Sequence, residues 1–270
     1  MSDFSRRVVL GKTGLEVSRL GVGSSYGVST RACRTAFDAG VNYFFWGSVR
    51  TAGMGVAIRD IARRDRGGII IVLESYLRSP KRLERSVHKG LAGLGVDHAD
   101  VLLLGWHDEL PAEQLLEGAE RLREQGLVRF LAVSSHQRPL FVQLLGDPRH
   151  DIFHVRYNAA HRGAESEVFP LLPAEGGPGI VSFTNTRWGD LLLPKNMPDG
   201  ETPPTASDCY RFSLSDPRVH VAICGPKNDA EMQTALEVLS TGPMNDDELA
   251  RMHRIGDRVH GVRSLMSVLS

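Results

Sequence analysis

The residues of this 270-residue chain that could carry acid–base chemistry follow short apolar runs. His107 and His136 each come shortly after such a run, and an imidazole titrates near neutral pH. Either could therefore act as a general base or acid, and a loop histidine bonded to the backbone is the alternative for each. Arg50 and Glu74 also follow apolar runs, so they could form an anion clamp with a tuned carboxylate or a structural ion pair.

Aromatic residues and potential metal ligands occur near the same runs. Trp46, Trp106 and Trp188 could form an aromatic binding wall, and ordinary packing is the alternative. Two groups of histidine and aspartate, at 107–136 and 150–154, do not match the ligand spacing of a known metal site, so no metal is expected. The three cysteines are isolated and form no CxxC pair, which excludes a zinc ribbon or an iron–sulfur cluster.

Eight short apolar runs alternate with amphipathic helical segments. The runs are rich in β-branched residues and apolar on both faces, as in strands that are covered on both sides. Eight such alternations predict a parallel sheet closed into a (β/α)₈ barrel, which places chemistry at the carboxyl ends of the strands. An open doubly wound sheet is the alternative, but no GxGxxG follows the first run. The expected strands are 19–23, 41–45, 69–73, 101–104, 128–133, 152–155, 179–183 and 219–223.

Helix and turn signals complete this architecture. Residues 7–17 read as a β-hairpin with its turn at 11–14, which could plug the amino-terminal end of the barrel. Residues 185–205 form a long loop with four prolines, and loops of this length are usually functional or mobile. Helices are expected over 30–39, 80–94, 111–125 and 245–259.

Composition limits the classes of function. Lys plus Arg and Asp plus Glu are each 32, so the formal charge is zero, which argues against non-specific nucleic-acid binding. A hydrophobic fraction of 41% is typical of a globular chain, and no apolar run approaches the roughly 20 residues that span a bilayer. We expect one soluble, cytoplasmic domain over residues 1–270 that takes a small-molecule substrate or ligand, with no nucleic-acid or membrane partner. The oligomeric state stays open.

Several motifs occur in an order that resembles a known family. The motif LGKTGLEVSRLGVG at residues 10–23 is followed by GVNYF, DHADVLLL, AVSSH, YNAAHRG and CGPKNDAEM. This succession resembles the aldo-keto reductases along nearly the whole chain. The resemblance implies a (β/α)₈ TIM barrel with an N-terminal β-hairpin, and an oxidoreductase that passes a hydride between NADPH and a carbonyl.

The resemblance does not extend to the four catalytic residues of the family. The family Asp and Tyr fall at Phe45 and Arg50, the Lys at Glu74 and the His at Gly105. In the family, the Tyr protonates the carbonyl oxygen, the Lys lowers its pKa, the Asp holds the Lys and the His orients the substrate. Arg50 stays protonated at neutral pH, so it cannot be a general acid, and Glu74 reverses the charge of the helper. Ordinary carbonyl reduction is therefore not expected.

The resemblance implies a partly kept NADP(H) site. The loop CGPKN matches the family loop that grips the adenosine 2′-phosphate, with Lys227 as the cation, and Phe183 falls where an aromatic ring stacks on the nicotinamide. The carboxamide-binding Gln of the family is replaced by His154, and its adenine-contacting Asn by Ala235. The cofactor-binding candidates are Ser134, Ser135, Asn158, Phe183, Gly225, Lys227 and Asn228.

Three functions compete on these grounds. The first is an NADP(H)-linked oxidoreductase with a rebuilt or degenerate site, in which His107 is the first replacement proton donor and His136 the second. The second is a cofactor-independent lyase or isomerase, and the third is a catalytically silent binding protein. The kept phosphate loop favours the first, and the four altered positions favour the other two.

Overall fold

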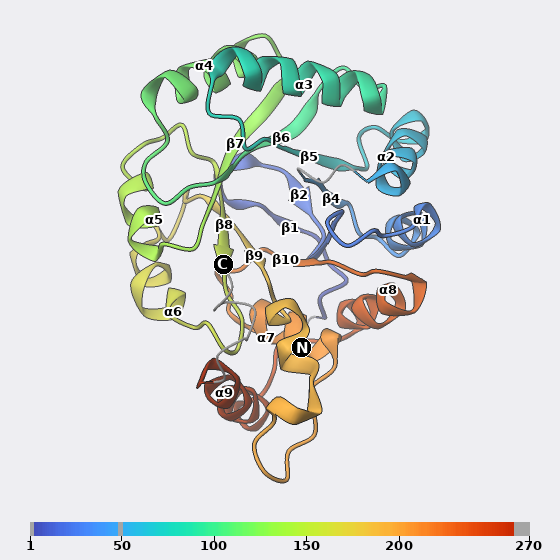
Figure 1. Cartoon of the computed structure of the whole chain (residues 1–270), viewed down its shortest axis with the longest axis vertical. Helices are drawn as coiled ribbons and strands as arrows, with labels where there is room; N and C mark the ends of the chain where they lie inside the picture. The colour runs from blue at the N-terminus through green and yellow to red at the C-terminus, as the bar shows by residue number, and fades with distance from the viewer. Residues whose placement is uncertain (1–2, 48–50, 262–270) are drawn as a thin grey trace.

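The computed structural model describes residues 3–47 and 51–261, and its centre is a closed barrel of parallel strands. The strands follow one another around the barrel in the order β10-β3-β4-β5-β6-β7-β8-β9, with helices on the outside (Figure 1). The predicted (β/α)₈ barrel is confirmed, because the eight parallel strands close into a barrel and each of the eight predicted runs overlaps one of them. The strands are β3 (Leu20–Gly23), β4 (Tyr43–Trp46), β5 (Ile70–Glu74), β6 (Ala99–Trp106), β7 (Val128–Ser135), β8 (Ile152–Arg156), β9 (Gly179–Phe183) and β10 (Val221–Cys224).

The helices begin and end at residues whose local chemistry explains their limits. Ser29 caps the first helix by accepting a hydrogen bond from the Ala32 amide, and Gly95 ends the third helix in the left-handed region with φ 64°. Thr205 and Asp208 form a capping box at the start of the seventh. The helices are α1 (Thr30–Asp38), α2 (Ala52–Arg64), α3 (Pro80–Leu94), α4 (Glu113–Glu124), α5 (Arg138–Leu144), α6 (Ala164–Glu167), α7 (Ala206–Ser215), α8 (Asp229–Leu236) and α9 (Asp246–Gly261).

A hairpin closes the amino-terminal end of the barrel, as the sequence predicts. Strands β1 (Val8–Val9) and β2 (Glu16–Val17) pair antiparallel around the short 3₁₀ helix η1 (Gly11–Thr13). Gly11 has φ 50°, and a Cβ there would lie 2.3 Å from the Gly179 nitrogen, so only glycine allows this approach. The Lys12 ammonium donates to the Pro148 carbonyl oxygen at 2.7 Å. The hairpin therefore contacts the segment before β8 through Lys12 and the start of β9 through Gly11.

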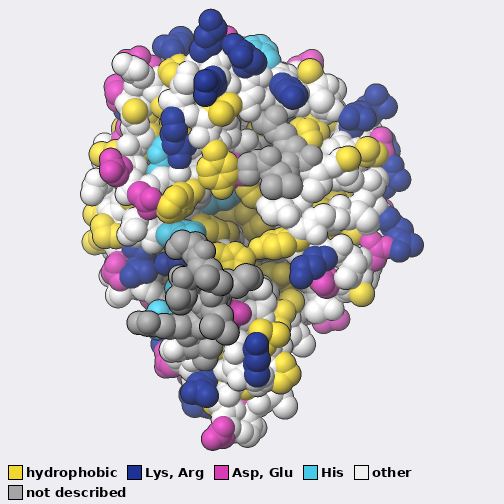
Figure 2. All heavy atoms as spheres, in the orientation of Figure 1, with side chains coloured by type: hydrophobic (Ala, Val, Ile, Leu, Met, Phe, Trp, Pro, Cys, Tyr) yellow, Lys and Arg dark blue, Asp and Glu magenta, His cyan; other side chains and the backbone are white. Residues whose placement is uncertain are grey.

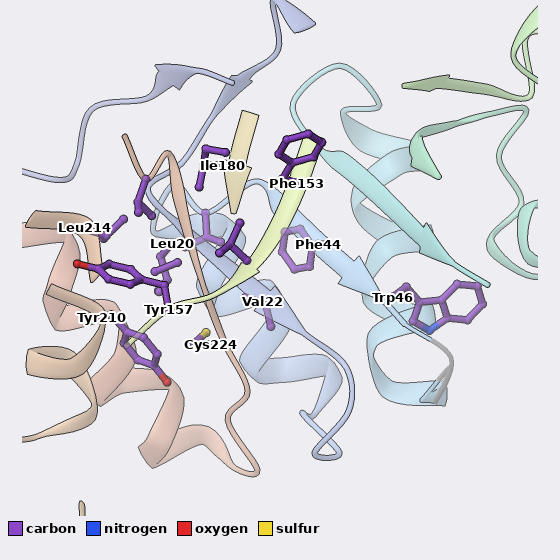
Figure 3. Close-up of a cluster of buried hydrophobic side chains, with 14 of the residues drawn as sticks. Leu20, Val22, Phe44, Trp46, Phe153, Tyr157, Ile180, Tyr210, Leu214 and Cys224 are labelled. Atoms are coloured by element: carbon purple, nitrogen blue, oxygen red, sulfur yellow. The ribbon is translucent and has the colours of Figure 1, made fainter. Parts of the chain in front are cut away.

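Two hydrophobic clusters follow from the alternation of side chains along each strand. One cluster lies between the barrel and the helices, and Figure 3 shows part of it, including Phe44, Phe153 and Ile180. The other fills the barrel interior together with the hairpin. We call it the interior cluster, and it consists of Leu10, Leu15, Val17, Tyr43, Ile70, Val72, Val101, Leu103, Ala132, Ile152, Val181 and Val221. A residue two positions beyond an interior residue on the same strand therefore also faces inward, and the last such residue of a strand lies at the carboxyl end of the barrel.

The predicted long loop after β9 contains two 3₁₀ helices, η3 (Arg187–Leu192) and η4 (Pro194–Asn196). Within the described residues, positive φ angles outside glycine occur only at its start: Thr184 at 55°, Arg187 at 49° and Trp188 at 54°. Such angles are costly for residues with a side chain and gather at functional sites. The strained backbone directly after β9 therefore points to a functional role for this end of the barrel.

None of the helices in the described ranges combines the length and the apolar character that crossing a bilayer would require.

Candidate functional site

Four side chains at the carboxyl ends of β6 to β9 form a continuous group. We call Trp106, His136, Arg156 and Phe183 the mouth cluster. The His136 ring lies 5.6 Å from the Phe183 ring at an interplanar angle of 23°, and 5.6 Å from the Trp106 ring at 57°. In the space-filling view, hydrophobic side chains gather at the recessed centre of the visible face, bordered by histidine (Figure 2). One imidazole is thus held between two aromatic rings.

The imidazole of His136 is electrostatically biased toward its neutral form. Burial lowers its pKa below the ordinary value, the positive charge of Arg156 lowers it further, and Asp108 opposes the shift. His136 is therefore largely neutral at pH 7, and it gains its proton only in more acidic solution. In this state it can accept a proton, and at lower pH it can donate one.

Arg156 supplies the cation of the mouth cluster. Ile152 belongs to the interior cluster and Phe153 to the outer one, so the alternation along β8 turns Arg156 inward, where it pairs in register with Phe183. Its side chain is half-buried. Burial and the charges of Arg138 and Arg187 lower its pKa. The cluster therefore has a positive potential.

Glu74 stands at the carboxyl end of β5, on the inward face that Ile70 and Val72 define. It is 5% exposed, and burial of the neighbouring Tyr76, together with the Glu74 charge, raises the pKa of that tyrosine to about 12. A Cβ at Gly47 would lie 3.0 Å from its Oε2 atom, so the carboxylate packs against the chain after β4. Glu74 also borders a groove of about 740 Å³ beside α3. Its predicted partner Arg50 lies outside the described residues.

His107 directly follows Trp106, but its ring contacts its own backbone and makes no ring contact with the mouth cluster in the described residues. Its Nε2 atom is 3.0 Å from the Leu104 carbonyl oxygen, and the side chain is 7% exposed. Burial and the charge of Arg78 lower its pKa to about 4. The ring is therefore neutral at pH 7 and donates its proton to the backbone, which corresponds to the loop histidine named above as the alternative.

Phe45 and Gly105 occupy two of the four positions that the family resemblance assigns to catalysis. The Phe45 ring faces the barrel interior, 5.8 Å from the ring of His154. Gly105 sits at a register shift in β6 with φ 75°, and a Cβ there would lie 3.0 Å from the Tyr76 ring. The first position is filled by hydrocarbon, and the second has a backbone that disfavours any side chain.

The side chains of three cofactor candidates already make contacts within the protein. Ser135 is almost fully buried, and its Oγ accepts from the Gln137 amide at 2.8 Å. Asn158 is fully buried, donates to the Thr184 carbonyl at 2.8 Å and accepts from the Ala160 amide at 3.0 Å. Phe183 stacks with His136. Ser134, which is 8% exposed, takes part in the barrel through its backbone carbonyl, which accepts from the His107 amide at 2.9 Å.

The predicted phosphate loop lies between β10 and α8. Lys227 is exposed, and Asn228 caps α8 by accepting from the Glu231 amide at 2.9 Å. The Glu231 carboxylate accepts in return from the Lys227 amide at 2.8 Å. At Gly225 a Cβ would lie 2.5 Å from the Tyr26 ring, so this ring covers the loop. The helix terminus thus offers one cation together with a carboxylate already bound to the amides.

The remaining expectations concern tryptophan and metal. Trp46 is buried in the outer cluster (Figure 3). Its Nε1 atom donates to the Thr51 carbonyl at 3.2 Å. Trp188 is 59% exposed, so of the three tryptophans it is Trp106 that stacks in the mouth cluster. In the part of the chain that the structure describes, no three His, Cys, Asp or Glu side chains gather in a way that could hold a metal.

Sequence reasoning missed Tyr76, whose pKa burial and the Glu74 charge raise, and left the charge of Arg156 unused. Tyr76 falls after the end of β5, where no strand pattern fixes its direction. The signal for Arg156 was available: Ile152, His154 and Arg156 alternate along one strand, so they share a face.

Comparisons with known proteins agree with this architecture. The sequence model of the aldo/keto reductase family matches residues 25–191. An aldo-keto reductase from Bacillus halodurans in its holo form is 18% identical with a TM-score of 0.76, and the match covers 93% of this chain and 96% of that one. An aldo/keto reductase from Klebsiella pneumoniae in complex with NADP and acetate gives the same four values. No curated protein sequence matches the chain. At 18% identity these structures show the shared fold alone.

Proposed function

Since the chain belongs to the aldo/keto reductase family, we propose that it is an NADP(H)-linked oxidoreductase with a degenerate catalytic tetrad and a rebuilt proton-transfer site. The altered positions Phe45, Arg50, Glu74 and Gly105 support the loss of the family set. Phe45 cannot act as a carboxylate, and Gly105 carries no side chain. Loss of a general acid typically slows a reaction by about 10²–10⁴-fold, so ordinary aldehyde and ketone reduction is expected to be slow.

The position of His136 between Trp106 and Phe183 is the observation that carries the rebuilt site. Its imidazole lies at the carboxyl end of the barrel, where the fold places chemistry, and beside the ring predicted to stack on a nicotinamide. His107 was the first candidate on sequence grounds. Its bond to Leu104 gives it less support than His136, although both stay candidates.

The residues present fit the cofactor in part. Lys227 offers a cation for a 2′-phosphate, whereas Glu231 holds a carboxylate at the same helix end. Asn158 is committed to its own chain, and His136 covers one side of Phe183. When bound, the cofactor would supply the hydride. This partial fit supports weak NADP(H) binding, with the 2′-phosphate near Lys227 and the nicotinamide over Phe183.

A test of this function measures NADPH-dependent reduction of 4-nitrobenzaldehyde from about pH 5 to about pH 8. We expect slow turnover that falls as the pH rises through the lowered pKa of His136, because only the imidazolium donates a proton. His136→Gln should abolish this turnover, and His107→Gln should leave it in place. Robust reduction that neither replacement changes would contradict the proposal.

A second function has one observation in its favour. Glu74 and the half-buried Arg156 each end a barrel strand, so a carboxylate and a cation stand at the carboxyl end where acid–base chemistry without a cofactor could use them. The absence of NADPH and NADP⁺ binding at millimolar concentration would favour this lyase or isomerase, or a silent binding protein. A small-molecule substrate, a single domain over residues 1–270 and a cytoplasmic location stay predictions.

A further inference from the structure

Arg156 is a cation without a counter-charge in the described part of the molecule. Within residues 3–47 and 51–261, no carboxylate forms an ion pair with its guanidinium, and no hydrogen bond to it is present. The group is half-buried, so it has lost part of its water without gaining a partner. Such a guanidinium is prepared to bind a ligand with two parallel oxygens, such as a carboxylate.

The neighbouring charges strengthen this argument. Arg138 is compensated by Glu167 at 2.8 Å, and Arg187 lies 3.9 Å from Asp190 and donates to the Val259 carbonyl. Both cations still act on Arg156, whose pKa they lower. A bound anion would relieve this repulsion without displacing an existing ion pair.

The other members of the mouth cluster set the rest of the ligand. Trp106 is 39% exposed, and its ring, His136 and Phe183 form an aromatic surface beside the guanidinium. The charge of Arg156 lowers the pKa of His136, and Phe183 is the register partner of Arg156 on the neighbouring strand. The aromatic surface therefore lies next to the guanidinium. Aromatic rings contribute stacking area for a planar apolar group.

We propose that the mouth cluster binds a small aromatic carboxylate, with its carboxylate on Arg156 and its ring on Trp106, His136 and Phe183. This inference names the ligand class of the same site and rests on the proposed function for its location. It needs no bound cofactor, so its failure and the failure of cofactor binding can be told apart.

The test is titration of the purified full chain with benzoate in the absence of NADP(H), followed by tryptophan fluorescence and calorimetry. Benzoate should bind saturably, the uncharged benzamide should bind at least about tenfold more weakly, and added salt should weaken benzoate alone. Arg156→Met should weaken benzoate at least about tenfold, whereas Arg156→Lys should keep part of the affinity. Arg63→Met, an exposed site on α2, is the matched control and should bind like the parent protein.

Three results would overturn the proposal. Benzoate could fail to bind the parent protein, it could bind Arg156→Met as well as the parent, or inorganic phosphate could displace it at a lower concentration than benzoate itself requires. The last result would identify a phosphate site. Arg156→Lys keeps the test decisive if Arg156→Met does not fold. NADPH titration of the same samples reports separately on the cofactor.

Discussion

The hydroxyl of Tyr43 lies 3.0 Å from the Nε2 atom of His154 inside the barrel, and both side chains are buried. Phe45 lies against His154, with its ring centre 5.8 Å from that of the imidazole. The family resemblance assigns a carboxamide-binding Gln to position 154. In this chain His154 instead pairs with Tyr43 inside the barrel, so its Nε2 atom already has a hydrogen-bond partner.

Tyr43→Phe should destabilise the protein by about 1–3 kcal/mol, because it leaves a buried imidazole nitrogen without a partner. Urea denaturation at neutral pH measures the change in the free energy of unfolding. Tyr26→Phe is the control, since Tyr26 is 46% exposed, and its effect should stay within about 0.5 kcal/mol. Equal effects of the two replacements would show that the Tyr43 hydroxyl contributes nothing specific.

The same pair predicts acid sensitivity. Burial lowers the pKa of His154 to about 3, whereas an unfolded histidine titrates near 6.5. Between these values the unfolded chain binds more protons than the folded one. The free energy of unfolding therefore falls as the pH drops from about 6.5 toward 3, by up to about 1.4 kcal/mol per pH unit for this group.

Urea denaturation at several pH values in this range checks that slope. His154→Gln should reduce the slope by the contribution of one histidine, whereas His88→Gln on the exposed face of α3 should leave it unchanged. An identical slope in all three proteins would mean that His154 is protonated as easily in the folded state as in the unfolded one.

The fold was predictable from the sequence to a large extent, and the site only in part. Each predicted run overlaps a strand because short apolar runs and glycine stops are local signals, and the hairpin turn carries its own glycines. The direction of a loop side chain has no such signal. His107 turns to the Leu104 carbonyl through a contact made after β6 ends, and Tyr76, whose pKa burial raises, comes close enough to Glu74 for that charge to raise it further. The stack of His136 on Phe183 joins the residue after β7 to the last residue of β9, and sequence spacing does not relate these two positions.

Gly105→His should not recreate the family histidine. The φ of 75° opposes any side chain, and a Cβ at this position would lie only 3.0 Å from the Tyr76 ring, so the replacement should cost about 1–3 kcal/mol. Thermal unfolding measures this loss, and reductase activity should not rise. Gly146→Ala is the control, because its Cβ would meet nothing closer than 3.4 Å. A stable Gly105→His protein with restored activity would contradict this account of the register shift in β6.

The loop before α8 predicts opposite effects of two neighbouring charges on cofactor preference. Lys227→Ala should weaken NADPH several-fold more than NADH, because only NADPH carries the 2′-phosphate. Glu231→Gln should strengthen NADPH, since it removes the carboxylate charge and keeps an oxygen for the Lys227 amide. Calorimetric titration of both variants with both cofactors gives the four affinities. Equal changes for NADPH and NADH would place the 2′-phosphate elsewhere.

The most direct measurement is titration of the purified protein with NADPH and NADP⁺, followed by tryptophan fluorescence, because Trp106 contacts His136, which stacks on Phe183, the ring over which the nicotinamide is predicted to lie. The account predicts weak, saturable binding of both forms that Lys227→Ala weakens. No detectable binding of either form at millimolar concentration would contradict the NADP(H)-linked function and leave a barrel that works without this cofactor.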